Sequence, residues 1–329
     1  MQKERFSGSL IGQCLGDALG LPVEGFPPAE CNLYVESMGR LGPRSARRGS
    51  LPFGQYSDDS QLARDLLQSY AACGRLDPED YARRIAAIFD EERIVGRGIA
   101  TDRAARRLIA GVRWEEAGEP APAAGNGSAM RAGPIGLIFR RDAESRSQAA
   151  HDQSRITHLD PRCSAGAVVI AEAVTMAVEP GPVDAALWAQ RLSERAAPFD
   201  RTFADHLLLL EDWTPRAVDQ VVARVPRRSG EPSSWYAWQG ISPFVVSSVL
   251  WSLYAFLRSP DDYWETMRTA IRVGGDVDTT AAMAGAISGA RIGLEGLPMD
   301  LAREVTDQGT WGFDELVALA HECHALQPD

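Results

Sequence analysis

Glycine recurs at every fourth residue from Gly8 to Gly20, near the start of the chain. Residues four apart lie on one face of an α-helix, so this spacing predicts a helix with glycine along one side. Glycine weakens a helix interior, and its repeated use indicates that another backbone approaches this face closely. A second stripe runs from Gly285 to Gly293. We expect the two helices to touch each other, or to cross a common partner, in the middle of the fold.

Apolar residues recur at helical spacing along most of the remaining chain, and no long stretch alternates apolar and polar residues as a β-strand does. Hydrophobic residues make up 45% of the 329-residue sequence, which is enough for a sizeable core. No internal repeat or low-complexity tract interrupts the pattern. We therefore predict an all-α fold in a single compact domain over residues 1–329.

Residues 24–56 break the helical pattern, because this segment contains four prolines and several glycines. Loops of this length in compact domains usually border or cover a functional site. We expect a long connection without a helix, lying over the site as a cover. Its arginines favour a solvated basic surface, with phosphate contact as the alternative.

The sequence carries a net charge of −11, which argues against binding nucleic acids or membranes through bulk positive charge. Five cysteines are scattered without a Cys-x-x-Cys pair, as is typical of free thiols in a reducing compartment. The apolar patch after Phe6 is interrupted by Gln13 and Asp17 and is too short to span a membrane. We expect a cytoplasmic protein.

Two short segments rich in carboxylates and hydroxyls each precede a helical pattern. The first is Ser57–Ser60, with the sequence Ser-Asp-Asp-Ser, and the second is Asp276–Thr280, with the sequence Asp-Val-Asp-Thr-Thr. Serine, threonine and aspartate are preferred helix N-caps, and acidic residues in a first turn suit the helix dipole. Capping therefore explains either segment taken alone. A cap needs only one side-chain oxygen, however, and each segment offers more.

The surplus carboxylates of each segment repel one another and lose solvation on burial unless a proton or a cation neutralises them. A hard divalent cation bound through oxygen is the simplest explanation. We interpret the two segments as halves of one metal site, held near each other by the two glycine-striped helices.

Three other features are weaker candidates for ligand contacts. The segment Gly125–Ser128 could expose backbone amides to a phosphate, although it lacks the complete pattern of a phosphate-binding loop and is also typical of a plain turn. His158 lies just before a predicted helix, where a packing or hydrogen-bonding role is the commoner one. Trp235, Tyr236 and Trp238 could stack on a base or sugar, or could anchor the core.

Four segments taken together resemble the ADP-ribosylglycohydrolase family. They occur in the order found in that family: Gly16–Gly20 with Glu24, Tyr56–Ser60, Gly125–Arg131 and Gly274–Thr279. Each is a weak signal alone, but four in order across nearly the whole chain are quite specific. The resemblance implies an all-α fold with a dinuclear magnesium or manganese centre in a central cleft.

The resemblance also implies roles for particular residues. The implied metal ligands are Ser57, Asp58, Asp59, Asp276, Asp278 and Thr279. Glu24 and Asp59 are the implied catalytic carboxylates, and Asp278 is the implied bridge between two cations. We predict substrate contacts at Gly125, Asn126, Gly127, Ser128, His158, Tyr236 and Gly275. Serine replaces the threonine that is commoner in the family at positions 57 and 60, and it keeps the hydroxyl oxygen that a metal needs.

The resemblance implies a hydrolase that cleaves the glycosidic bond at the anomeric carbon of ADP-ribose conjugates and releases ADP-ribose. Two Mg²⁺ or Mn²⁺ ions would activate a bridging water, and Glu24 or Asp59 would handle its proton. The substrate would be an ADP-ribosylated protein, nucleic-acid base or small molecule. The alternatives are a catalytically silent relative that binds ADP-ribose and a magnesium-dependent phosphohydrolase.

Overall fold

The computed structural model describes residues 3–41, 49, 51–225, 229–235 and 237–327. Over these residues the protein consists of α-helices joined by loops and short 3-10 turns, and its β-structure is limited to isolated bridges. The predicted all-α fold is therefore confirmed. Within the same ranges no helix is both long and apolar enough to cross a lipid bilayer.

The helices of the first half of the chain are α1 (Lys3–Gly20), η1 (Leu21–Val23), α2 (Pro28–Leu41), α3 (Asp58–Cys73), α4 (Pro78–Asp90), α5 (Ile99–Ile109), α6 (Trp114–Ala117), α7 (Gly133–Ile138) and α8 (Ala143–Arg155). Those of the second half are α9 (Pro161–Ala177), α10 (Ala185–Ala196), α11 (Arg201–Leu207), α12 (Leu209–Trp213), α13 (Val218–Val222), η3 (Ser233–Trp235), α15 (Val245–Arg258), α16 (Tyr263–Ile271), α17 (Val277–Ile292), η4 (Leu294–Gly296), α18 (Met299–Ala302) and α19 (Phe313–Ala325).

Helices α1 and α17 lie at the centre of the fold and are buried over almost their whole length. They run antiparallel with their glycine stripes in contact, as expected. A Cβ atom on Gly12 would lie 2.5 Å from the carbonyl oxygen of Gly285, and one on Gly8 would lie 2.6 Å from that of Gly289. Glycine is therefore required at these positions because the two backbones touch.

The same contact joins the end of α1 to the start of α17. A Cβ atom on Gly20 would lie 2.5 Å from the Cα atom of Asp278. Along the interface the Ser9 hydroxyl donates to the carbonyl oxygen of Ala286 at 2.8 Å. The first turn of α17 is thus held directly against the last turn of α1, the turn that follows Asp17.

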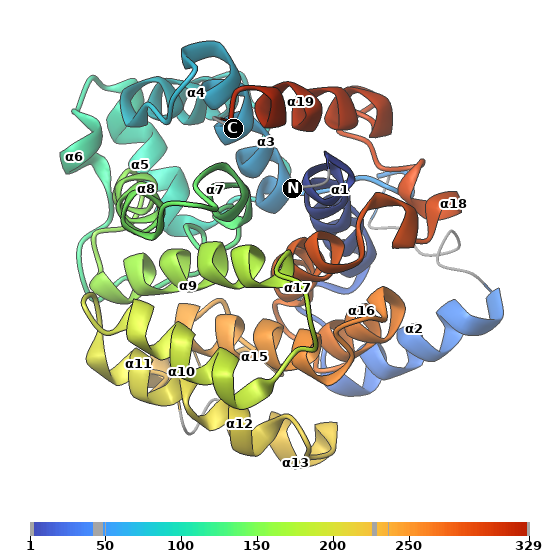
Figure 1. Cartoon of the computed structure of the whole chain (residues 1–329). Helices are drawn as coiled ribbons and strands as arrows, with labels where there is room; N and C mark the ends of the chain where they lie inside the picture. The colour runs from blue at the N-terminus through green and yellow to red at the C-terminus, as the bar shows by residue number, and fades with distance from the viewer. Residues whose placement is uncertain (1–2, 42–48, 50, 226–228, 236, 328–329) are drawn as a thin grey trace.

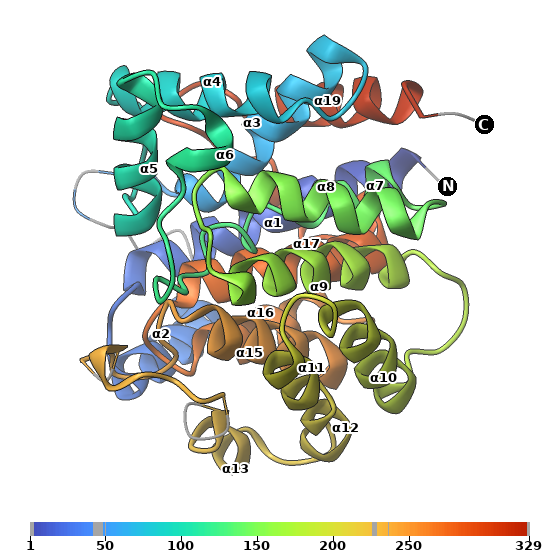
Figure 2. The same cartoon turned by 90° about the vertical axis from the view of Figure 1, so that its left-hand side faces the viewer.

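The other helices surround this central pair (Figures 1 and 2). Helices α3, α4 and α19 lie on one side of it, whereas α10–α13, α15 and α16 lie on the opposite side. Helices α7 and α9 pack against the pair between these two groups. Helices α9 and α15 are buried on nearly all faces, so a single apolar core continues from one side of the molecule to the other.

The expectation that residues 24–56 contain no helix is wrong, because Pro28–Leu41 forms α2. Proline in the first turn of a helix removes only an amide that would lack a partner anyway. Cys31, Val35 and Met38 recur at helical spacing and are buried against the core. The prolines therefore mark where this helix begins. The expected cover also included the segment that follows α2. Most of that segment, residues 42–48 and 50, lies outside the described residues.

Candidate active site

The first acidic segment forms the start of α3. Ser57 is the N-cap: its hydroxyl oxygen accepts from the Asp59 amide at 3.4 Å, and the hydroxyl donates to Oδ2 of Asp59 at 2.9 Å. The Asp58 amide donates to the carbonyl oxygen of Val95 at 2.6 Å. Capping, the simpler explanation of this segment, is thus present, but it occupies only part of the oxygen atoms. Oδ1 of Asp59 is buried and has no hydrogen-bond partner among the described residues.

The second acidic segment forms the start of α17. Gly274 and Gly275 both adopt positive φ angles, +73° and +84°, and turn the chain sharply into the helix. Asp276 occupies the N-cap position without a side-chain capping bond. Its carboxylate instead accepts from the Thr279 hydroxyl at 3.2 Å and from the Asn126 side-chain amide at 2.5 Å. The carboxylate is therefore turned toward the loop that holds Asn126.

The carboxylates of the two segments converge in space. One oxygen from each of Asp17, Asp59 and Asp278 lies within 4.8 Å of the other two, and the same holds for Glu24, Asp276 and Asp278. Asp278 belongs to both groups. An acidic side chain shared by two sets of oxygen ligands is the arrangement expected of a residue that bridges two cation positions.

The electrostatics of this cluster favour a bound cation. Burial, and after it repulsion from neighbouring carboxylates, raises the pKa of Asp58 and of Asp276 to about 7. Burial, followed by the same repulsion, holds the pKa of Asp59 and of Asp278 well above the usual aspartate range. Within the described part of the chain, Asp58, Asp59, Asp276 and Asp278 form no ion pair, and buried oxygen ligands of this kind fit a divalent metal ion.

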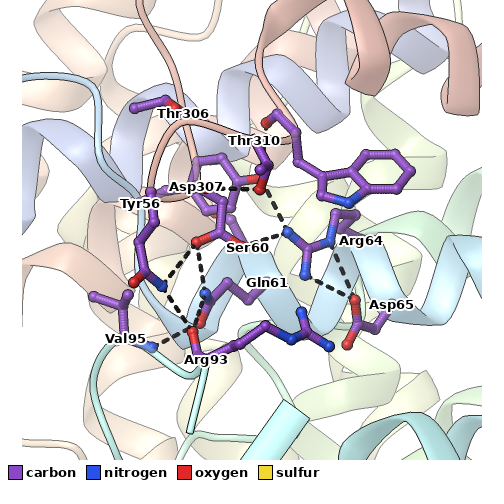
Figure 3. A network of polar contacts seen from close by, with 12 residues as sticks. Tyr56, Ser60, Gln61, Arg64, Asp65, Arg93, Val95, Thr306, Asp307 and Thr310 are labelled. Carbon is purple, nitrogen blue, oxygen red and sulfur yellow. Dashed lines mark hydrogen bonds and ion pairs between the residues drawn. The ribbon is translucent and has the colours of Figure 1, made fainter. Parts of the chain in front are cut away.

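A network behind α3 fixes the position of its first turns (Figure 3). Arg64, only 1% exposed, donates to Asp307 at 2.6 Å and to Asp65 at 3.0 Å. Gln61 donates to Asp307 at 2.8 Å and accepts from the amide of Val95 at 2.8 Å. The start of α3 is thereby tied to two loops, one before α5 and one before α19, and the first of these loops reaches the candidate site.

A cavity of about 380 Å³ opens beside the carboxylates. The cavity is lined by Glu24 and by five of the six implied metal ligands, namely Asp58, Asp59, Asp276, Asp278 and Thr279. The loop Gly125–Gly127, His158 and the first turn of α5 also line it. The two acidic segments and the predicted ligand-contact loop therefore share one cavity, although they are far apart in the sequence.

Several predicted substrate contacts do not line this cavity. Ser128 is buried behind the loop, where its hydroxyl donates to the carbonyl oxygen of Cys163 at 3.2 Å. Gly275 packs on backbone, since its amide donates to the carbonyl oxygen of Phe26 at 2.9 Å. Tyr236 lies outside the described residues, but its neighbours Trp235 and Trp238 both line the cavity. Ser57 is adjacent to the cavity without lining it.

The comparisons with known proteins agree with this geometry. A family model described as ADP-ribosylglycohydrolase matches residues 1–329. The chain belongs to the ADP-ribosylglycohydrolase family. It is accordingly a glycohydrolase enzyme, as the sequence motifs predicted.

Individual members of the ADP-ribosylglycohydrolase family resemble the chain over most of its length. It is 29% identical to ADP-ribosylhydrolase ARH3 of Gallus gallus, over 98% of this chain and 93% of that protein. It is 26% identical to ADP-ribosylarginine hydrolase Tri1 of Pseudomonas putida (strain GB-1), over 92% of this chain and 74% of that protein. A solved structure titled "ADP-ribosylglycohydrolase-related protein complex" superposes with a TM-score of 0.73 at 25% identity, covering 99% of both chains.

Asp17 is the acidic residue of this ADP-ribosylglycohydrolase that sequence reasoning missed. Its carboxylate accepts from the Ser57 amide at 2.9 Å and from the Ser60 hydroxyl at 2.7 Å. Burial raises its pKa to about 7. One sequence feature points to Asp17: it lies within a glycine-striped helix that is expected to be buried, where a charged side chain is unusual. Asp17 thus links α1 to the cap of α3, next to Asp59 and Asp278.

The first turn of α5 was also missed as part of the site. Residues 96–101 line the cavity, and Gly98 begins α5 without a side-chain cap. The β-branched residues Ile99 and Thr101 give weak helical signals, so the sequence does not mark clearly where α5 begins. The side chains of Arg97 and Arg103 also line the cavity at this helix. That these residues line the same cavity as the loop Gly125–Gly127 depends on tertiary packing.

Proposed function

We propose that this enzyme is a metal-dependent hydrolase that cleaves the glycosidic bond at the anomeric carbon of ADP-ribose conjugates and releases ADP-ribose. The observation that carries the proposal is the sharing of Asp278 between two groups of carboxylates at one cavity. The substrate class follows from the family and from the curated relatives, whose names specify ADP-ribosyl hydrolysis.

The proposed cofactors are two Mg²⁺ ions, or two Mn²⁺ ions in their place. The proposed ligands are Ser57, Asp58, Asp59, Asp276, Asp278 and Thr279, with Glu24 and Asp17 close enough to take part. All of them offer oxygen, which both ions prefer. When bound, the ions would supply positive charge that activates a water molecule and stabilises the sugar hydroxyls in the transition state.

The chain's own residues are placed to bind ADP-ribose in the adjoining cavity. The uncapped first turn of α5 and the amides of Gly125 and Gly127 offer N–H groups of the kind that bind phosphate oxygens, whereas the Asn126 amide donates to the carbonyl oxygen of Pro243 at 2.9 Å. Trp235 and Trp238 offer flat apolar surfaces for a base or sugar ring. A cavity of about 380 Å³ is within the range used by proteins for small ligands.

Glu24 and Asp59 are the proposed proton carriers. Both line the cavity, and Oδ1 of Asp59 has no hydrogen-bond partner among the described residues. In the proposed reaction a water oxygen forms a bond to the anomeric carbon while the bond to the leaving group breaks. One carboxylate accepts the proton of the water, and the departing group leaves with a proton.

The substrate partner is proposed to be an ADP-ribosylated protein, base or small molecule. Incubating the enzyme with ADP-ribosyl-arginine, an ADP-ribosyl-serine peptide and O-acetyl-ADP-ribose, with Mg²⁺ or with EDTA, tests the proposal. We expect free ADP-ribose with at least one substrate, only when Mg²⁺ is present. Release of AMP or phosphate would instead indicate a phosphohydrolase. Binding of ADP-ribose without turnover of any conjugate would indicate a catalytically silent relative.

A further inference from the structure

The imidazole ring of His158 separates the cavity from a buried polar network. The residue is 2% exposed, and it lines the cavity. A Cβ atom on Gly125 would lie 3.4 Å from Nε2, and one on Gly127 would lie 2.9 Å from Cε1. Nε2 is therefore on the side of the ring that faces the ligand loop. No hydrogen bond from Nε2 to another described residue is present.

Nδ1, on the other side of the ring, lies 2.8 Å from the hydroxyl oxygen of Thr157. The same hydroxyl oxygen lies 2.8 Å from Nη2 of Arg131. A guanidinium can only donate hydrogen bonds, so the Thr157 oxygen accepts from Arg131. The hydroxyl still has its own proton to donate, and Nδ1 of His158 is the acceptor in contact with it.

The opposite arrangement, with the ring proton on Nδ1, would leave a hydrogen bond unmade. Thr157 would then accept from both Arg131 and His158, and its own proton would have no acceptor among the described residues. A buried donor without an acceptor costs about 1–3 kcal/mol. This penalty favours the tautomer in which Nδ1 accepts and Nε2 carries the proton.

Arg131 is held rigidly and keeps its positive charge near the ring. Nε of Arg131 donates to the side-chain oxygen Oε1 of Gln153 at 2.8 Å, and Nη2 of Arg131 donates to the backbone carbonyl oxygen of Gln153 at 2.9 Å. The guanidinium lies over the ring of Tyr81 at 5.6 Å and forms no ion pair with a described carboxylate. Burial, and then the charge of Arg131, lower the pKa of His158 to about 3, although Asp160 opposes the shift. The carboxylate of Asp160 is itself paired with Arg162 at 2.7 Å.

We propose that Arg131 and Thr157 are positioning residues that hold His158 as the neutral tautomer protonated on Nε2. The ring then donates one hydrogen bond into the cavity, to an oxygen atom of the bound ligand. It cannot accept a proton there, so it is not the base of the reaction. This inference rests on the proposed function only for the identity of the ligand, ADP-ribose.

Nuclear magnetic resonance tests the tautomer directly in the ligand-free protein. In protein labelled with ¹⁵N-histidine, long-range ¹H–¹⁵N spectra distinguish the ring nitrogen that carries a proton from the bare one. The signals of His158 are those lost in a His158→Gln variant. We expect a neutral ring protonated on Nε2 throughout the range from pH 5 to pH 9. A proton on Nδ1, or an imidazolium at pH 5, would overturn the proposal.

Substitution of Thr157 tests whether its hydroxyl sets the tautomer of His158. Thr157→Val keeps the shape and removes the hydroxyl, so we expect the His158 signals to shift toward a mixture of tautomers. The KM for the conjugate and the Kd for ADP-ribose should rise about tenfold, with kcat changed less than twofold. Thr157→Ser restores the hydroxyl and should return both the spectrum and the affinity close to wild type.

Thr175→Val is the matched control, because Thr175 is also buried and its hydroxyl donates at 2.6 Å to the carbonyl oxygen of Gly136, away from the cavity. It should leave the His158 signals and the Kd unchanged. An unchanged Nε2-protonated spectrum in Thr157→Val would show that Thr157 does not set the tautomer. If the wild type fails to bind ADP-ribose, the proposed function is wrong, while the spectrum of the ligand-free protein still decides the tautomer.

Discussion

At the scale of single residues, the site depends on carboxylates that are buried at a high electrostatic cost. Asp278 shows this most clearly, because it lies 4% exposed between two groups of acidic side chains. Without a cation, such a carboxylate favours its protonated form, whereas a bound cation makes the charged form favourable. The same side chain therefore destabilises the metal-free protein and binds the metal.

Asp278→Asn tests this dual role. The substitution keeps the volume and removes the charge, so we expect turnover of ADP-ribosyl conjugates to fall at least about a hundredfold, a loss of about 2.7 kcal/mol of transition-state stabilisation. The metal-free variant should melt at or above the temperature of the metal-free wild type, because a buried charge is removed. Steady-state kinetics and differential scanning calorimetry measure the two effects. Asp142→Asn, at the exposed N-cap of α8, is the control and should change neither.

The stability of the metal-free protein should depend on pH in a direction fixed by these groups. Unfolded aspartates have a pKa near 3.9, whereas burial raises the pKa of Asp17, Asp58 and Asp276 to about 7. Between these values the folded state binds more protons than the unfolded state. The free energy of unfolding should therefore fall as the pH rises from about 4 to about 7.

Urea unfolding in EDTA at a series of pH values measures this fall. Each of the two proposed Mg²⁺ ions, at a hundred times its Kd, should raise the free energy of unfolding by about 2.7 kcal/mol at pH 7.5. A metal-free stability that rises over the same pH range would contradict the assignment of a cation site to these carboxylates.

At the scale of helices, the close contact between α1 and α17 sets the distance between the two acidic segments. We expect Gly12→Ala to destabilise the protein by about 1–3 kcal/mol, because its Cβ atom would lie 2.5 Å from backbone of α17. The variant should also bind Mg²⁺ more weakly, since α17 carries Asp278. Urea unfolding with and without Mg²⁺ gives both numbers.

Gly74→Ala is the control for this prediction. Gly74 ends α3 with a φ of +65°, and a Cβ atom there would meet no other atom within 4 Å. We expect a loss of about 1–2 kcal/mol from backbone strain alone, with the stabilisation by Mg²⁺ unchanged. Equal loss of Mg²⁺ stabilisation in both variants would show that the α1–α17 contact does not position the site.

The ion pairs and hydrogen bonds around Arg64 (Figure 3) fix the position of α3. Arg64→Ala would leave the carboxylates of Asp65 and Asp307 buried without their cation, and we expect a loss of about 3–5 kcal/mol. Arg106→Ala, which removes an exposed pair with Asp102 on α5, should change stability little. Thermal unfolding followed by circular dichroism separates them, and equal shifts in the two variants would contradict the structural role of Arg64.

At the scale of the whole molecule, the sequence was most informative where a residue type has only one reason to be present. Glycine every fourth residue indicated the central helix contact, because no other residue allows two backbones to touch. The repeated carboxylates at two helix starts likewise indicated that the starts of α3 and α17 meet. The structure places both features as expected.

The sequence was less informative where a residue type has several uses. Proline both interrupts helices and begins them, so the prolines near α2 do not distinguish a loop from the start of a helix. Asp17 carries no clear signal in the sequence, because an aspartate within a helix is ordinarily solvent-exposed. The contact of α5 with the loop Gly125–Gly127, and the position of Ser128 behind that loop, follow from packing between segments far apart in the chain.

The central claim is that the starts of α3 and α17 form one metal centre with Asp278 shared between two ions. Anomalous X-ray scattering from crystals grown with Mn²⁺ measures this directly. We expect two anomalous peaks beside the cavity, each within about 2.5 Å of a carboxylate oxygen of Asp278. Peaks only at other places on the protein, or no peak at saturating Mn²⁺, would contradict the claim.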